Sequence, residues 1–157
     1  RFLLKVHVAL PAKDEIKEIL ARTTDASAQH AEKTINGAEA EEFRGFIREL
    51  ITGDNIKDYA VRLVMATHHE SGYAPDIVKK FVRYGSSPRG AQALMVAGKV
   101  YAAMDGRLHV AFEDIRRAAY PALRHRILLN FEGQAEGVST EKIVGALLEG
   151  IPEMEGK

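Results

Sequence analysis

The stretch that decides how the chain is organised is Tyr84-Gly85-Ser86-Ser87-Pro88-Arg89-Gly90-Ala91. Gly85 permits a break in the backbone, and either serine can cap a helix that follows it. Pro88 suits the first helical position, where its missing N–H costs nothing. The pattern therefore predicts a helix that begins here and runs over residues 87–105, apolar on several sides and hence central.

Arg89 falls in the first turn of this predicted helix, close to the positive end of the helix dipole. A cation there is mildly unfavourable unless an anion arrives to be shared. Backbone N–H groups at a helix start, together with a guanidinium, form an arrangement that binds phosphate. The alternative is that Arg89 is a solvated first-turn residue without a ligand, because caps and arginines are both common.

The composition is that of a globular piece and excludes several function classes. The chain has 157 residues, of which 46% are hydrophobic and 28% charged, and its 22 acidic residues balance its 22 basic ones. A neutral balance gives no electrostatic footprint for nucleic acid or an anionic membrane. There is no cysteine, no leader pattern and no apolar run of the length that spans a bilayer. We expect a cytoplasmic protein.

Alternating apolar residues predict a buried strand over residues 2–10. A lone strand leaves its backbone groups unpaired, so we expect its sheet partners to lie upstream of this sequence. The rest of the chain is helical in pattern, with a polar linker near residues 25–38. The fold class is therefore an all-α bundle of about five to seven helices with one short amino-terminal strand. The helix over residues 112–124 is expected to bend or break near Pro121, and the last helix is expected to begin after Ser139, which caps it. The other helices are expected over residues 13–24, 39–50, 53–69, 76–82 and 87–105.

Four motifs in a fixed order extend the interpretation of residues 84–91. After Gly85-Ser86-Ser87-Pro88-Arg89-Gly90 come Gly106-Arg107-Leu108-His109-Val110, Glu113-Asp114-Ile115 and Leu123-Arg124-His125-Arg126-Ile127. In order and spacing they resemble the carboxy-terminal lid of the MoxR-type AAA+ ATPases, with its pattern G-A-S-P-R-A, G-R-x-x-V, E-D-V and L-x-H-R. The opening Arg1-Phe2-Leu3-Leu4 resembles the D-R-F-L that ends the ATPase core in that family. The resemblance spans nearly the whole chain.

The resemblance implies a division of the chain and a parent activity. Residues 1–12 would be the carboxy-terminal edge of the AAA+ core with its hinge, and residues 13–157 the helical lid. The parent would use ATP and Mg to remodel partner proteins in a chaperone-like way. Implied partners are the protein's own AAA+ core, further copies in a homo-oligomeric ring, and a protein with a von Willebrand A domain.

Two arginines acquire roles from the same resemblance. Arg89 would be the sensor-2 arginine, contacting phosphates bound by its own core, with Ser87 and Pro88 at the same helix start. Arg1 would be the arginine finger that reaches a neighbouring subunit's nucleotide, although the aspartate that usually precedes it is absent. Either guanidinium would stabilise charge that develops on the transferred phosphoryl group.

Other searches for chemistry are negative or ambiguous. The sequence has neither a phosphate loop nor an apolar strand that ends in Asp-Glu, so we expect the chain alone to bind ATP weakly or not at all and to be inactive. His68 and His69 point about 100 degrees apart on a helix and predict no metal site. The Arg124-His125-Arg126 run either grips a phosphate or packs at a helix end with paired charges. Glu113 and Asp114 are interpreted as first-turn acids favoured by the dipole, in a helix that lacks the family's usual Thr-Pro start.

A second function class remains open from the sequence. The chain could be a non-catalytic helical module that binds a partner protein through an apolar groove. A nucleic-acid binder is a poorer third choice because the net charge is zero. The phosphate-binding pattern at residues 85–89 favours the ATPase lid, since a passive module has no need of it.

Overall fold

The computed structural model describes residues 2–24 and 32–155, which fall into two compact units. The larger unit combines the start of the chain up to Lys5 with everything from Gly45 onward, and the smaller one is Val6–Arg44. Both ends of the smaller unit therefore return to the larger one. The division falls within helix α2 (Gly37–Glu49).

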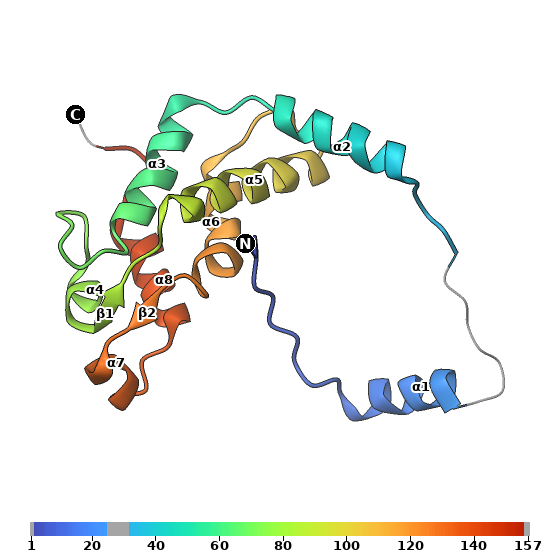
Figure 1. The fold of residues 1–157 in the computed structure, drawn as a ribbon, viewed down its shortest axis with the longest axis horizontal. Helices are drawn as coiled ribbons and strands as arrows, with labels where there is room; N and C mark the ends of the chain where they lie inside the picture. Colours follow the sequence, from blue (N-terminus) through green and yellow to red (C-terminus); the bar gives the residue numbers. More distant parts are fainter. Residues whose placement is uncertain (1, 25–31, 156–157) are drawn as a thin grey trace. The chain divides into compact units, whose positions relative to one another are not determined.

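The larger unit is a helical bundle with a minimal sheet (Figure 1). Helix α5, the longest in it, packs along α6 and against α3, while α8 packs on α6 and α4. The elements in chain order are α3 (Asp54–Met65), α4 (Asp76–Phe81), β1 (Val82–Tyr84), α5 (Pro88–Met104), α6 (Phe112–Leu123), β2 (Leu128–Leu129), α7 (Phe131–Ala135) and α8 (Thr140–Gly150).

The core of this unit lies between α3, α5, α6 and α8, as helical periodicity predicted. Apolar side chains spaced three or four residues apart point inward from each of these helices. Ser139 caps α8, as expected, by accepting a hydrogen bond from the Lys142 N–H. Gly106 follows α5 with a positive φ of 72°. The largest fully buried apolar side chains are Tyr59, Leu63, Val78, Leu94, Ile115, Leu123, Ile143, Val144 and Leu147.

Two short strands and a short helix were not predicted. Strands β1 and β2 pair antiparallel, with Val82 opposite Leu129 and Tyr84 opposite Leu128. This pairing joins the chain just before α5 to the chain just after α6. With α7, the described residues form eight helices rather than the expected five to seven. Helix α6 continues through Pro121 and ends two residues later, so the expected interruption is absent.

The strand expected over residues 2–10 does not form in this structure. No strand is assigned there, and the side chains of Phe2, Val6, Val8 and Leu10 are exposed. Among the described residues the sheet consists of β1 and β2, and the Lys5 N–H donates to the Pro121 carbonyl at the end of α6, so the segment joins no ladder. Leu4 alone packs against the core of the larger unit.

The smaller unit contains α1 (Lys13–Thr24), at the bounds expected from the sequence, and the first part of α2. Helix α2 begins at Gly37, two residues before the expected Glu39, because Asn36 and Glu39 cap it reciprocally. The Asn36 N–H donates to the Glu39 carboxylate at 2.7 Å, and the Glu39 N–H donates to Asn36 Oδ1 at 3.0 Å. Of the predicted linker, residues 25–31 lie outside the described residues, and residues 32–36 are non-helical.

Among the described residues, no helix is both long and apolar enough to cross a membrane.

Candidate functional site

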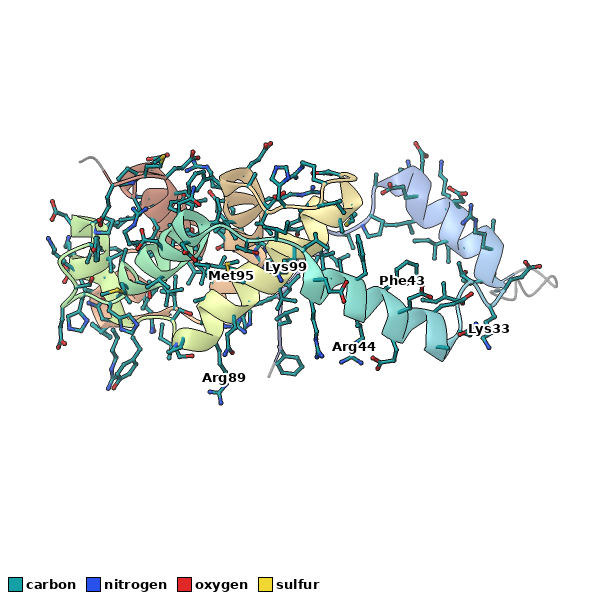
Figure 2. All side chains as sticks on the ribbon, turned by 90° about the horizontal axis from the view of Figure 1, so that it is seen from above. Lys33, Phe43, Arg44, Arg89, Met95 and Lys99 are labelled. Carbon is teal, nitrogen blue, oxygen red and sulfur yellow. The ribbon has the colours of Figure 1, made fainter. Side chains whose placement is uncertain are left out.

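The start of α5 presents Arg89 to solvent, as the sequence predicted. Ser87 is the N-cap residue in an extended conformation, but its hydroxyl accepts no backbone N–H, and Pro88 stands in the first turn. Arg89 is exposed, and Figure 2 shows its side chain projecting away from the helix. Within the part of the chain that the structure describes, Arg89 makes no hydrogen bond or ion pair. Pro88 has no N–H, and the Gly90 N–H donates to the Ser87 carbonyl at 2.7 Å. The first turn of α5 therefore offers an unpaired guanidinium beside the backbone N–H of Arg89.

The segment before α5 is held by the residues that follow α3. Thr67 Oγ1 accepts a hydrogen bond from the Ser86 N–H at 2.8 Å and donates to the Val64 carbonyl at 2.6 Å. Thr67 and Ser86 are both fully buried. A Cβ atom added at Gly85 would lie 2.6 Å from the Thr67 carbonyl oxygen, so only glycine fits there. The position from which Arg89 projects is thus set by packing against α3.

His68 has a structural role at the same place. Its Nε2 lies 2.9 Å from the Ser86 carbonyl oxygen, which can only accept, so His68 donates this hydrogen bond. His69 lies 3.7 Å from the Glu70 carboxylate instead. No group of three or more His, Asp or Glu side chains among the described residues could hold a metal ion.

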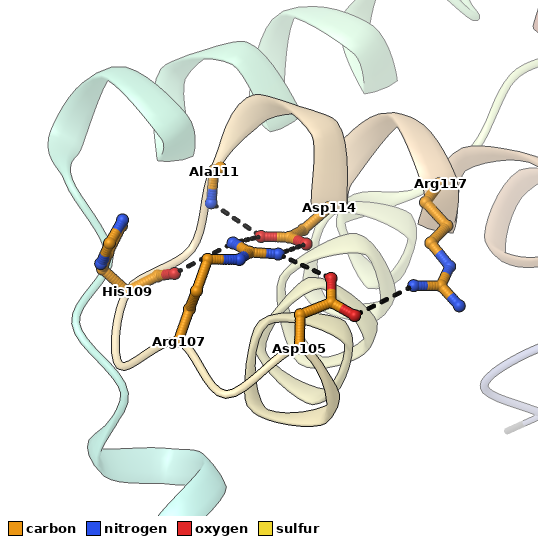
Figure 3. A network of polar contacts seen from close by, with 6 residues as sticks. All are labelled: Asp105, Arg107, His109, Ala111, Asp114 and Arg117. Carbon is orange, nitrogen blue, oxygen red and sulfur yellow. Dashed lines mark hydrogen bonds and ion pairs between the residues drawn. The ribbon is translucent and has the colours of Figure 1, made fainter.

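The G-R-x-x-V and E-D-I motifs meet in a buried ion pair that the sequence interpretation missed (Figure 3). The Arg107 guanidinium donates to both carboxylate oxygens of Asp114, at 2.7 and 2.6 Å. The Asp114 side chain is 2% exposed, and that of Arg107 28%. Asp105 also accepts from Arg107 at 3.0 Å and lies 3.8 Å from Arg117. The network fastens the end of α5 to the start of α6.

Asp114 supplies one half of a capping box at the start of α6. Its Oδ2 accepts the N–H of the N-cap residue Ala111 at 2.8 Å, while Ala111 has no side-chain oxygen that could accept the Asp114 N–H in return. Burial raises the pKa of Asp114, but the hydrogen bonds from Arg107 and from the Ala111 N–H outweigh it, and the pKa lies below its ordinary value. Asp114 is therefore charged and has a structural role. The sequence indicated only a first-turn acid favoured by the helix dipole, whereas the structure adds the ion pair with Arg107. The seven-residue spacing between two opposite charges, Arg107 directly after Gly106 and Asp114, was the available signal.

The Arg124-His125-Arg126 run packs at the end of α6, which was one of the two interpretations left open. Arg124 Nε donates to the Tyr120 carbonyl at 3.1 Å. Arg126 donates to main-chain carbonyls, including that of Phe2 at 2.9 Å. The second predicted catalytic residue, Arg1, lies outside the described residues.

The comparisons with known proteins agree with the fold. Residues 75–147 match the family model of the AAA lid domain. Over 151 residues the chain is 27% identical to "Chaperone MoxR1" of Mycobacterium tuberculosis, covering 96% of this chain and 40% of that protein. It is 30% identical over 155 residues to "Uncharacterized protein YeaC" of Bacillus subtilis, covering 96% of this chain and 45% of that one. A crystal structure from Cytophaga hutchinsonii, named "putative ATPase", superposes with a TM-score of 0.90 at 29% identity, covering 99% of this chain and 47% of that one.

Bundle, motifs and family match together define the class: the chain carries an AAA+ lid domain. More narrowly, it is homologous to the MoxR-type AAA+ ATPases and corresponds to their lid portion. The chain spans less than half the length of each of these three relatives.

Proposed function

We propose that this chain is the lid part of a longer AAA+ ATPase in which Arg89 acts as the sensor-2 arginine. The observation that carries the proposal is the exposed, unpaired Arg89 in the uncapped first turn of α5. An anion placed there would meet a guanidinium, the backbone N–H of Arg89 and the positive end of a helix. The MoxR-type relatives support ATP as the source of that anion.

The residues present fit a nucleotide phosphate. Arg89 would supply a planar fork of donors, and its own backbone N–H, directly after Ser87 and Pro88, would supply a further donor. ATP with Mg supplies the phosphoryl group whose transfer releases the energy. Because Thr67 and His68 hold the segment before α5, Arg89 would approach the phosphates from a rigid base and move with the lid as one body.

The relatives also support a wider proposal about the whole protein. We infer that it forms a homo-oligomeric ring in which Arg1 is the arginine finger toward a neighbour, and that hydrolysis drives chaperone-like remodelling. A protein with a von Willebrand A domain is the proposed companion. The relative named as a chaperone supports this function over that of a passive interaction module.

The test is Arg89→Ala in the full-length ATPase. Turnover should fall about 100-fold, because the transferring phosphoryl group loses a fixed donor. Folding stability should change by less than about 0.5 kcal/mol, because the side chain is exposed and without a protein partner. Arg89→Lys should restore little, since a point charge does not reproduce the planar fork.

Arg48→Ala is a matched control, because Arg48 is exposed and lies on α2, far along the chain from the start of α5. It should leave turnover unchanged. If Arg89→Ala hydrolyses ATP like the wild type and loses several degrees of melting temperature, Arg89 is a structural residue and the assignment fails.

A further inference from the structure

The two peptide groups that meet at Ser86 are both held by residues that follow α3. Thr67 Oγ1 accepts the Ser86 N–H at 2.8 Å, and His68 Nε2 donates to the Ser86 carbonyl at 2.9 Å. The Thr67 hydroxyl has one hydrogen, which it donates to the Val64 carbonyl at 2.6 Å, so towards Ser86 its oxygen accepts. The main chain is therefore fixed at Ser86, three residues before Arg89.

The contact with the Thr67 hydroxyl is the stronger of the two. Thr67 and Ser86 are both 0% exposed, so water cannot replace the hydroxyl as the acceptor of the Ser86 N–H. A buried N–H that loses its acceptor costs more than the hydrogen bond itself contributes. The His68 side chain is exposed, and water can take over its hydrogen bond. The Ser86 N–H is thus the group that ties the start of α5 to the end of α3.

The main chain is held a second time directly after Arg89. Gly90 is buried, and a Cβ atom added there would lie 2.1 Å from Ser86 Oγ and 3.2 Å from Leu123 Cδ2. The Ser86 side chain and the end of α6 therefore fill the space beside Gly90. Between these two points the ring of Pro88 fixes a further backbone angle. Ser86 and Gly90 together therefore determine where the Cα of Arg89 lies.

We propose that Thr67 is a positioning residue for Arg89, acting through the main chain of Ser86, with His68 in a supporting role. The inference rests on the proposed contact of Arg89 with nucleotide phosphate. It adds that a hydroxyl at the end of α3, too buried to meet a ligand, sets the point from which the guanidinium reaches the phosphate. A displacement of about 1 Å can cost a catalytic group about 100-fold in rate, so this placement matters for turnover.

The test is a double-mutant cycle on ATP turnover in the full-length ATPase. Thr67→Val nearly keeps the shape of the side chain but leaves the Ser86 N–H unpaired, and it should slow turnover about 10- to 100-fold. If Thr67 acts through Arg89, the double variant should be no slower than Arg89→Ala alone. Thr67→Ser keeps the hydroxyl and should restore most of the turnover.

The other outcomes separate this inference from the proposed function. If Thr67→Val turns over ATP like the wild type while Arg89→Ala is slow, the positioning role is wrong and the role of Arg89 stands. The same holds if the two losses multiply, or if Thr67→Ser is as slow as Thr67→Val, because the residue then only stabilises the fold. If Arg89→Ala is as active as the wild type, the proposed function fails and this inference fails with it.

Amide exchange in the same proteins shows whether the contact exists and whether the variants are folded. The Ser86 N–H should be protected in the wild type and should exchange at least about ten-fold faster in Thr67→Val, while the amides of α8 stay protected. A Ser86 N–H that exchanges freely in the folded wild type would overturn the proposal.

His68→Ala and His69→Ala are a matched pair that decides the question if Thr67→Val does not fold. Both histidine side chains are exposed, but His68 donates to the Ser86 carbonyl and His69 does not. His68→Ala should slow turnover roughly three- to ten-fold, the worth of one hydrogen bond, and should add nothing to Arg89→Ala. His69→Ala should leave turnover unchanged. Equal turnover in the two single variants would show that the contacts of Ser86 do not position Arg89.

Discussion

Arg107 and Asp114 form a two-bond ion pair, with N–O distances of 2.7 and 2.6 Å, across the turn between α5 and α6. One partner is nearly completely buried, and the other is about three-quarters covered. The pair links the end of α5, whose first turn carries Arg89, to the start of α6. The helix that presents Arg89 is thus fastened at both ends, because Thr67 holds the segment before it.

We expect Asp114→Ala to destabilise the chain by about 2 to 4 kcal/mol, because it leaves Arg107 without its main partner and removes the cap of α6. Urea unfolding of the wild type and the variant measures the difference. Glu113→Ala is the matched control, since Glu113 is the exposed neighbour in the same turn and should change stability by less than about 0.5 kcal/mol. Equal effects of the two substitutions would contradict the buried role of Asp114.

Stability should also depend on pH through Asp114. Its folded-state pKa lies below the ordinary value, so its contribution is complete above the unfolded pKa of about 3.9 and is lost as the pH falls through the folded pKa. The wild type should therefore lose more stability between pH 6 and pH 3 than Asp114→Asn, which has no proton to gain. Equal losses of unfolding free energy between pH 6 and pH 3 in the wild type and in Asp114→Asn would show that protonation of Asp114 is not linked to folding.

Gly85→Ala should destabilise the chain by roughly 1 to 3 kcal/mol, because the new methyl group would overlap the main chain of Thr67. Thermal unfolding followed by circular dichroism measures the effect. Gly45→Ala supplies the contrast: Gly45 lies within α2 with open space around it, so alanine there should stabilise by about 0.5 to 1 kcal/mol. If Gly85→Ala unfolds at the same temperature as the wild type, α5 can shift away from Thr67 at little cost in free energy.

The chain by itself should bind ATP weakly or not at all. Arg89 and one helix start are a small part of a nucleotide site, and the sequence holds no phosphate loop. Calorimetric titration with ATP and Mg tests this expectation. Micromolar affinity, or measurable hydrolysis by the purified chain, would show that the nucleotide site lies within these residues.

The sequence by itself determined the helices of the bundle other than α7. Helix α5 begins at Pro88 and Ser139 caps α8, both as predicted, and the periodicity of α3 turns Tyr59 and Leu63 inward. These features depend on periodicity and on capping within a few residues, so they follow from local sequence. The order and spacing of four short motifs were likewise enough to indicate the MoxR-type lid.

Only the tertiary structure decided what the polar residues of those motifs contact. Gly85 was expected for its backbone freedom, but the approach of Thr67 is what requires it. The sequence predicted no metal site at His68 and left the role of Arg126 open. It did not indicate that each donates to a main-chain carbonyl of a segment distant in the sequence. The strand expected over residues 2–10 failed for the same physical reason. An alternating pattern or a charged side chain specifies what a residue can do, whereas the partner that satisfies it is chosen only when the elements pack together.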